Sequence, residues 1–136
     1  MIILVDTDIL IDVALDRAPF ADAAAELLDA LEHGTPRGFV AWHTISNFYY
    51  LVAPKQGRTG TLQFVNEIMQ FLDVAPTTSV HLRRALDLPL RDFDDAMQVG
   101  AATACNADYI ATRNVKDFKK SPIPAVAPAH VLSRLV

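Results

Sequence analysis

The stretch IILVDTDILID, residues 2–12, decides the fold. Its first four residues are apolar without alternation, which is typical of a parallel strand buried on both faces. Asp6 follows this strand directly, and Asp8 lies two positions further on. Because ligands of open parallel sheets bind at the carboxyl ends of the strands, the stretch predicts an α/β fold with an acidic site at that edge.

Short apolar segments and helical segments alternate along the rest of the chain. After residues 2–5, the expected strands are 38–42, 73–75 and 109–111, with a doubtful edge strand at Val126 between two prolines. The expected helices are a stretch broken near Pro19, then 20–33, 44–52, 61–72, 79–86, 92–105 and a last turn at 129–135, with a loop at 54–57. This order predicts one α/β domain over residues 1–136, with a central, mostly parallel sheet flanked by helices.

The composition is that of a globular protein with a modest acidic balance. Of the 136 residues, 51% are apolar and 21% are charged, and the net charge is −4. A protein that coats nucleic acid would carry a basic surface, so this balance argues against that class. It argues less against a nuclease, because metal ions in an acidic site supply the positive charge that phosphates need.

The cysteine usage and the apolar runs indicate a compartment. Cys105 is the one cysteine of the sequence, so no intramolecular disulfide can form and a reducing environment is expected. The apolar N-terminus reaches Asp6 too early for a secretory signal and lacks a basic segment before it. No apolar run reaches the roughly 18 residues of a membrane span. We therefore expect a soluble, cytoplasmic protein with no membrane partner.

Two acidic motifs lie at predicted helix starts, and each has a structural alternative to a functional role. Asp6 or Asp8 could simply cap the helix that follows. Asp92 could likewise be an N-cap, with Asp94 and Asp95 favoured in the first turn by the helix dipole. At about 100° per residue, Asp92 and Asp95 lie within about 60° of each other, whereas Asp94 points about 160° away from Asp92. The helical pattern thus predicts a site for Asp92 and Asp95 that Asp94 does not join.

A third polar motif, TRNVKDF at residues 112–118, follows the strand expected at 109–111. Thr112 and Asn114 could do no more than satisfy the backbone groups of a turn. Asp117 adds another carboxylate at the carboxyl edge of the sheet. Arg113 and Lys116 belong to a local basic segment, which is either a solvated loop or a contact for nucleic-acid phosphates.

Together these motifs offer hard oxygen ligands without cysteine or paired histidine. Such a set suits Mg²⁺ or Mn²⁺ rather than Zn²⁺. Crowded carboxylates repel one another, and their pKa values rise unless a cation holds them. A divalent cation in an acidic cleft indicates phosphoryl chemistry, in which metal ions activate water and stabilise the developing charge.

The remaining polar and aromatic residues are expected to be structural. The four histidines show no ligand spacing, and Ser46 lacks the flanking glycines of a nucleophile elbow. Trp42, Tyr49 and Tyr50 are expected in the core rather than as platforms for stacked bases.

The three motifs resemble those of PIN-domain proteins, and most closely the VapC-type toxins of prokaryotic toxin–antitoxin pairs. The resemblance covers essentially the whole chain and is carried by VDTDILID at 5–12, DFDDAMQ at 92–98 and TRNVKDF at 112–118. It implies a three-layer PIN-like domain with the activity of an endoribonuclease. It also implies dependence on Mg²⁺ or Mn²⁺, a homodimer, and a restraining antitoxin protein.

The same resemblance implies roles for individual residues. The expected metal ligands are Asp6, Asp95 and Asp117. Asp92 is expected as a further catalytic acid that supports them. The supporting polar residues implied at the other motif positions are Asp8, Asn47, Thr112 and Asn114. Arg113 and Lys116 are the expected contacts for RNA.

Two positions depart from the family pattern. Such domains usually carry a glutamate in the first helix after the second strand, and Asn47 stands there in this chain, as in a similar subgroup. An amide can ligate Mg²⁺ through its oxygen but carries no charge and cannot act as a base. Asp8 occupies a place more often held by asparagine, and it restores the charge only if its side chain turns toward the site.

Two rival functions follow from the same residues. A non-catalytic PIN-like module that binds RNA or protein through a weakened metal site would account for Asn47. A phosphatase of the haloacid-dehalogenase kind would use Asp6 as its nucleophile and Asp8 as its acid. That family needs a later lysine motif and a larger core domain, neither of which the sequence offers.

Overall fold

A five-stranded parallel sheet forms the centre of the molecule. The computed structural model describes residues 1–135, and within them the strands are β1 (Ile2–Val5), β2 (Arg37–Val40), β3 (Leu72–Val74), β4 (Tyr109–Ala111) and β5 (Ala125–Val126). Their order is β3-β2-β1-β4-β5, and every neighbouring pair runs parallel. The sheet expected to be mostly parallel is therefore parallel throughout the described residues, and the doubtful strand at Val126 is its edge.

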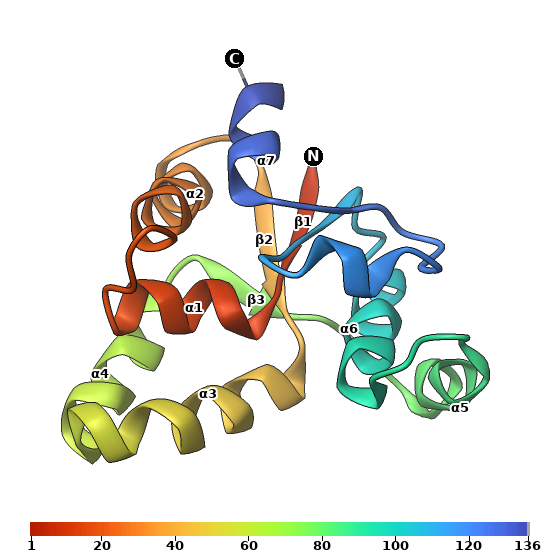
Figure 1. Ribbon diagram of the computed structural model, residues 1–136, viewed down its shortest axis with the longest axis horizontal. Helices are drawn as coiled ribbons and strands as arrows, with labels where there is room; N and C mark the ends of the chain where they lie inside the picture. Colours follow the sequence, from red (N-terminus) through yellow and green to blue (C-terminus); the bar gives the residue numbers. More distant parts are fainter. Residues whose placement is uncertain (136) are drawn as a thin grey trace.

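Helices cover both faces of this sheet. They are α1 (Thr7–Ala14), α2 (Ala21–His33), α3 (Trp42–Gln56), α4 (Arg58–Ile68), α5 (Ser79–Asp87), α6 (Phe93–Ala104) and α7 (Pro128–Arg134), with a 3₁₀ helix η1 (Val115–Phe118) after β4. Figure 1 shows α1 to α4 on one side of the strands and α5 and α6 on the other. This three-layer α/β arrangement confirms the predicted fold class.

The central strand β1 explains why the layers hold together. Ile3, Leu4 and Val5 are fully buried. Successive side chains of a strand point to opposite faces. Ile3 and Val5 accordingly pack into the core with α1, α2 and α3, and Leu4 packs into the core with α6. The unalternating apolar run of β1 thus reflects burial on both faces, as the sequence predicted.

The helix predicted to end at Val52 continues to Gln56, so the loop expected at residues 54–57 is wrong for its first three positions. Pro54 lies in the last turn of α3, where its missing N–H removes a single backbone hydrogen bond. Gly57 ends the helix in its place. Its φ is +83°, a left-handed conformation that glycine adopts without strain, and its N–H donates to the Ala53 carbonyl at 2.8 Å.

Several element boundaries near the sheet also differ from the prediction. The second strand ends at Val40 instead of residue 42, because Trp42 begins α3. The helix expected to reach Leu72 stops at Ile68, and Leu72 instead lies buried in β3.

Trp42 and Tyr50 are 77% and 73% exposed, so the expectation that they belong to the core is wrong. Within residues 1–135, none of the helices is long and apolar enough to cross a membrane.

Candidate metal centre

Polar side chains meet at the carboxyl edge of β1 and β4. The hydrogen bonding of these two strands continues one residue beyond β1, because the Asp6 N–H donates to the Ala111 carbonyl at 2.9 Å. This bond places Asp6 beside Thr112, the residue that follows β4. The sheet itself therefore brings the first and third polar motifs together.

Asp6 caps a helix and faces the site at the same time. Its Oδ1 accepts the Thr7 N–H at 2.8 Å, which makes it the N-cap of α1, and its Oδ2 accepts the Thr112 hydroxyl at 2.8 Å. The capping role and the functional role are thus compatible. Burial, followed by repulsion from Asp8, raises the pKa of Asp6 to about 7. A carboxylate of this kind is stabilised in its charged form by a cation.

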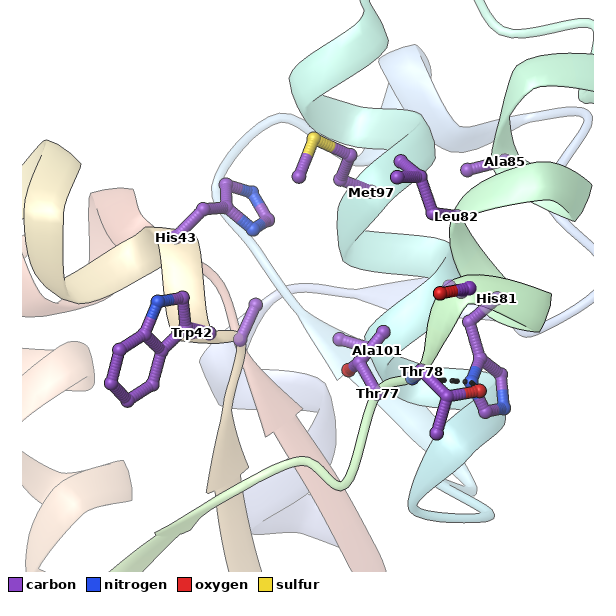
Figure 2. Close-up of a pocket in the computed structure, with 12 residues that line it drawn as sticks. Trp42, His43, Thr77, Thr78, His81, Leu82, Ala85, Met97 and Ala101 are labelled. Atoms are coloured by element: carbon purple, nitrogen blue, oxygen red, sulfur yellow. Dashed lines mark hydrogen bonds between the residues drawn. The ribbon is translucent and has the colours of Figure 1, made fainter.

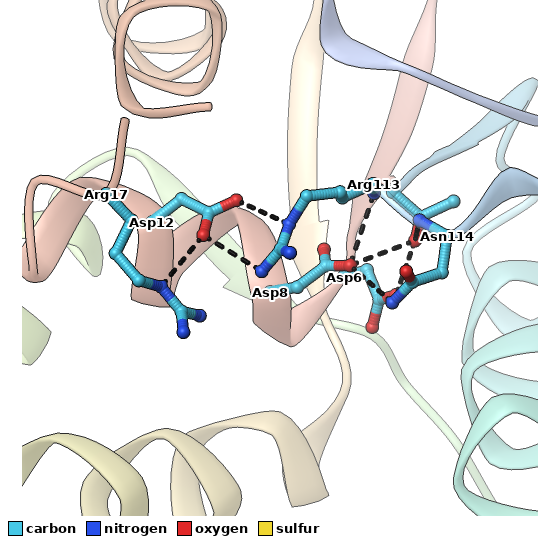
Figure 3. Close-up of polar contacts among 7 residues, drawn as sticks. Asp6, Asp8, Asp12, Arg17, Arg113 and Asn114 are labelled. Atoms are coloured by element: carbon cyan, nitrogen blue, oxygen red, sulfur yellow. Dashed lines mark hydrogen bonds and ion pairs between the residues drawn. The ribbon is translucent and has the colours of Figure 1, made fainter. Parts of the chain in front are cut away.

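Asp8 turns toward the site, as the charge argument required (Figure 3). Its Oδ2 accepts the Arg113 N–H at 3.2 Å and the Asn114 side-chain amide at 3.1 Å. Its Oδ1 is buried and has no hydrogen-bond partner within residues 1–135. Burial raises the pKa of Asp8 as well. A buried carboxylate oxygen without a protein partner is what a bound cation would satisfy.

The start of α6 corrects the prediction about Asp94. One carboxylate oxygen from each of Asp92, Asp94 and Asp95 lies within 4.8 Å of the other two, so Asp94 joins both neighbours. The helical projection failed because Asp92 is not part of the helix. Its backbone is extended, with φ −103° and ψ 125°, and its Oδ1 accepts the Asp94 N–H at 2.8 Å as an N-cap.

Asp95 is the acid that the other carboxylates surround. Burial, followed by repulsion from Asp92, Asp94, Asp117 and Asp8, raises its pKa to about 6. The repelling acids come from α1, from the start of α6 and from η1, three segments that lie far apart in the sequence. The structure thus gathers the carboxylates of all three motifs around Asp95.

Asn47, which stands where the resemblance predicts a glutamate, holds Asp94. The Asn47 side-chain amide donates to Asp94 Oδ1 at 3.0 Å, and His43 Nε2 lies 2.9 Å from the same oxygen. These contacts lower the pKa of Asp94, the contact with His43 most strongly. The uncharged residue at position 47 therefore anchors an additional negative charge from α6. Neither His43 nor Asp94 was predicted in the site.

Arg113 binds inside the fold (Figure 3). Its Nε and Nη2 donate to the two Asp12 oxygens at 3.0 and 3.1 Å, and its guanidinium carbon lies 4.3 Å from the centre of the Phe20 ring. Asp12 is 1% exposed and also accepts a hydrogen bond from Arg17 at 3.1 Å. The predicted contact between Arg113 and RNA stays a prediction, and its guanidinium already neutralises a buried acid.

The acids line an open hollow of about 470 Å³. The predicted residues that line it are Asp6, Asp8, Asn47, Asp92, Asp95, Asn114 and Asp117. The lining residues that the sequence did not predict are Thr7, Ile11, Tyr50, Leu51 and Asp94. Thr112 is fully buried beneath the hollow, and neither Arg113 nor Lys116 is among the lining residues. A lining this rich in carboxylates can hold a cation.

The donor set fits a divalent cation that prefers oxygen. Carboxylates and two amides come from α1, α3, the start of α6 and η1, and Asp8 Oδ1 is free within residues 1–135 to ligate. Mg²⁺ and Mn²⁺ prefer such oxygen ligands, whereas structural Zn²⁺ sites use cysteine and histidine. Of the acids, Asp6, Asp8 and Asp95 carry the raised pKa values that a bound cation would lower.

A second hollow, of about 280 Å³, lies between the start of α3, α5 and α6 (Figure 2). Its lining, within residues 1–135, contains no acidic side chain. His43 lines it and contacts Asp94 at the acid site, while His81 lines it and accepts the Thr78 N–H at 3.0 Å to cap α5. This hollow therefore offers no oxygen ligands of the kind that surround Asp95.

The sequence model of the PIN domain family matches residues 2–116, and the chain belongs to the PIN domain family. The matched span contains Asp6, Asp95 and Asn114. Comparison with curated proteins gave no match. Membership of this family leaves the phosphatase interpretation of Asp6 without support.

Solved structures of toxin–antitoxin proteins share the fold. VapBC2 from Rickettsia felis, bound to a DNA fragment from their promoter, matches with a TM-score of 0.74 at 16% identity, over 93% of this chain and 98% of that chain. VapBC-1 from nontypeable Haemophilus influenzae matches with 0.71 at 18% identity, over 95% and 99%. VapC20 from Mycobacterium tuberculosis, a sarcin–ricin loop cleaving toxin, matches with 0.65 at 15% identity, over 79% and 86%. At these identities the likeness concerns the fold alone.

Proposed function

We propose that this protein is a metal-dependent endoribonuclease, with Mg²⁺ or Mn²⁺ as its cofactor. The observation that carries the proposal is the arrangement around Asp95, where carboxylates from three separate segments converge beside the buried, unpartnered Oδ1 of Asp8 within residues 1–135. So many acids in one hollow are costly without a cation. Membership of the PIN domain family supports phosphodiester hydrolysis as the use of that cation.

The proposed ligands are Asp6, Asp95 and Asp117, with Asp92 as a further catalytic acid. A bound divalent cation supplies Lewis acidity, lowering the pKa of water and stabilising charge on the phosphate. The protein contributes the positions of the acids. Thr112 fixes Asp6 through a 2.8 Å hydrogen bond, and the Asp92 cap fixes the first turn of α6, which carries Asp95.

Asp8 and the pair formed by Asn47 and Asp94 complete the charge of the proposed site. Asn114 donates to Asp8, and Asn47 donates to Asp94. Both amides therefore orient carboxylates without adding charge. Asp8 and Asp94 thus supply negative charge in place of the glutamate that the family pattern predicts. This supports an active nuclease over a decayed site.

Cleavage of RNA by the purified protein tests the proposal. Mg²⁺- or Mn²⁺-dependent cleavage is expected from the wild type and from the control variant Asp87→Asn. Asp87 is an exposed acid at the end of α5 that does not line the acid hollow and is not a proposed ligand. Asp6→Asn and Asp95→Asn should each lose about a hundredfold or more in rate, as when a group that stabilises the transition state is removed. Unchanged cleavage in both variants would refute it.

The rival proposal, a non-catalytic module, predicts a different calorimetric result. Titration with Mn²⁺ should give saturable binding in the wild type and weaker binding in Asp95→Asn. A protein that binds no Mn²⁺ at millimolar concentration, and that still binds RNA, would be the module. The Asn47 side chain motivates this alternative, because it carries no charge.

We also propose that the protein is the toxin of a toxin–antitoxin pair, a cytoplasmic homodimer held inactive by an antitoxin protein. The fold shared with VapBC2 and VapBC-1 supports this proposal. A short reading frame beside the gene should encode the antitoxin. Co-expression of the two should yield a complex that does not cleave RNA, and sedimentation of the free protein should give twice the mass of one chain.

A further inference from the structure

Two adjoining hollows share the acids of the candidate metal centre. The hollow of about 470 Å³ described above is lined by Asp92, Asp95 and Asp117, and the same three residues line a neighbouring hollow of about 530 Å³. The acids therefore stand between two open spaces. Arg91 and Phe93 complete the lining of the hollow of about 530 Å³.

Each hollow presents an aromatic side chain to solvent. Phe93, the first residue of α6, is 46% exposed and belongs to neither of the two core clusters. Tyr50 on α3 is 73% exposed and lines the first hollow beside Leu51, itself 57% exposed. Burial in the core thus accounts for neither ring. Aromatic side chains on which unpaired bases stack are a recurrent feature of proteins that bind single-stranded nucleic acid.

Arg91 adds a positive charge to the hollow of about 530 Å³. It is exposed, and no ion pair engages it within residues 1–135 although Asp92, Asp95 and Asp117 line the same space. A guanidinium binds phosphate through a planar fork of donors. A cation beside an aromatic ring provides one contact for a backbone phosphate and one for a base.

We propose that the two hollows bind unpaired RNA nucleotides on the two sides of the phosphate held at the acids. Phe93 stacks a base in one hollow, Tyr50 stacks a base in the other, and Arg91 contacts a neighbouring phosphate. This inference rests on the proposed ribonuclease function. A paired base does not offer its face to a side chain, so stacking on Phe93 and Tyr50 should be lost when the RNA is a duplex.

Equilibrium binding separates this inference from the cleavage reaction. A fluorescently labelled single-stranded RNA is titrated with the full chain in Ca²⁺ in place of Mg²⁺, with gels confirming that the RNA stays intact. Anisotropy should report binding that is roughly fivefold or more weaker for Phe93→Leu and for Tyr50→Leu, the loss expected when a stacked base loses its platform. Arg91→Gln should weaken binding and flatten its dependence on salt.

Matched controls and rescue keep the outcome interpretable. Trp42→Leu removes a 77% exposed ring that lines neither acid hollow, and Arg83→Gln removes an exposed charge on α5, so both should bind within twofold of the wild type. Phe93→Trp should restore binding. A duplex of the same sequence should bind more weakly and be insensitive to Phe93→Leu.

Each outcome bears on one proposal. Metal-dependent cleavage together with unchanged binding in Phe93→Leu and Tyr50→Leu overturns the inference and leaves the ribonuclease standing. Weaker binding in those variants, without any cleavage by the wild type, supports the nucleotide sites and overturns the ribonuclease. Equal losses for single-stranded and duplex RNA also overturn the inference, because stacking on unpaired bases could not cause them.

Discussion

Gln98 Nε2 donates a 2.8 Å hydrogen bond to the Thr44 hydroxyl, which ties α6 to α3 in the interior beneath the acids. The same amide lies 3.3 Å from the Thr7 hydroxyl, and Thr7 donates to Thr44 at 3.0 Å. Gln98 and Thr44 are fully buried. Thr7, Thr44 and Gln98 each lie close in sequence to a residue of the site. The hydrogen bonds among these three side chains therefore set the spacing of Asp6, Asn47 and Asp95.

Replacing Gln98 with methionine should loosen the site more than it weakens the fold. The change removes the hydrogen bonds to Thr44 and Thr7, but it also removes Oε1, which is buried and without a partner within residues 1–135. We therefore expect a loss of unfolding free energy of only about 1 kcal/mol. Affinity for Mn²⁺ should fall several-fold.

Urea denaturation and calorimetric titration with Mn²⁺ measure the two effects. A large loss of stability with unchanged affinity would make Gln98 purely structural. Gln63→Met, on the exposed face of α4, is the matched control and should change neither quantity.

Loss of Arg113 should destabilise the protein strongly. Its guanidinium binds both oxygens of Asp12, which is 1% exposed, and removing one partner of a buried pair costs roughly 3 kcal/mol. Arg113→Gln should therefore lower the unfolding free energy by about that amount. Arg17→Gln is the control, because Arg17 is 40% exposed and Arg113 still neutralises Asp12. Equal, small losses in both variants would contradict the assignment.

Asp94 should be needed for metal binding although a helical projection excludes it. Its carboxylate lies within the group formed with Asp92 and Asp95, and Asn47 holds it there. Asp94→Asn removes a negative charge from that group, and the affinity for Mn²⁺ is expected to fall about tenfold, the equivalent of about 1.4 kcal/mol. The exposed Asp87→Asn serves again for comparison. An unaltered dissociation constant would leave Asp94 as a partner of His43 and Asn47 only.

Stability of the metal-free protein should fall as the pH rises. The pKa of Asp6 is raised from 3.8 to about 7 in the fold, chiefly by burial. Between those values the folded protein holds a proton that the unfolded chain has lost. The contribution of Asp6 is thus fully present below pH 3.8 and is lost as the pH rises to about 7, by up to about 1.4 kcal/mol per pH unit.

Urea denaturation at pH 5 and pH 7.5 with a chelator present checks this sign. Asp6→Asn keeps the oxygen that caps α1 and should show a flatter dependence on pH than the wild type. Mg²⁺ should stabilise the wild type more at pH 7.5 than at pH 5, because protons compete with the cation for the carboxylates. If the stability of the wild type does not fall with pH more steeply than that of Asp6→Asn, the pKa of Asp6 is not raised.

Local patterns in the sequence were sufficient for the strands that carry the site. β1 matches its predicted range because an apolar run without alternation has few other uses, and β4 does so for the same reason. Asp6 could be singled out because an acid placed directly after a buried strand is costly without a purpose, whereas Asp95 was singled out through the resemblance of the motif at 92–98.

The errors have physical causes that a linear pattern does not contain. Pro54 does not end α3, because only one hydrogen bond is lost in a last turn. Asp94 was excluded by treating the N-cap Asp92 as a helical residue. Trp42 and Tyr50 are exposed although aromatic, and exposure depends on which elements pack nearby. The buried contacts of Arg113 with Asp12 join residues 101 positions apart, so no local pattern could reveal them.

The proposed ligands are carried at positions 6, 95 and 117, on segments that only the closed sheet brings together. A growing chain on the ribosome therefore has no complete cation site until Asp117 has been made and β4 has docked beside β1. For the proposed ribonuclease, this order of assembly keeps the site incomplete while the message for the earlier residues is being translated.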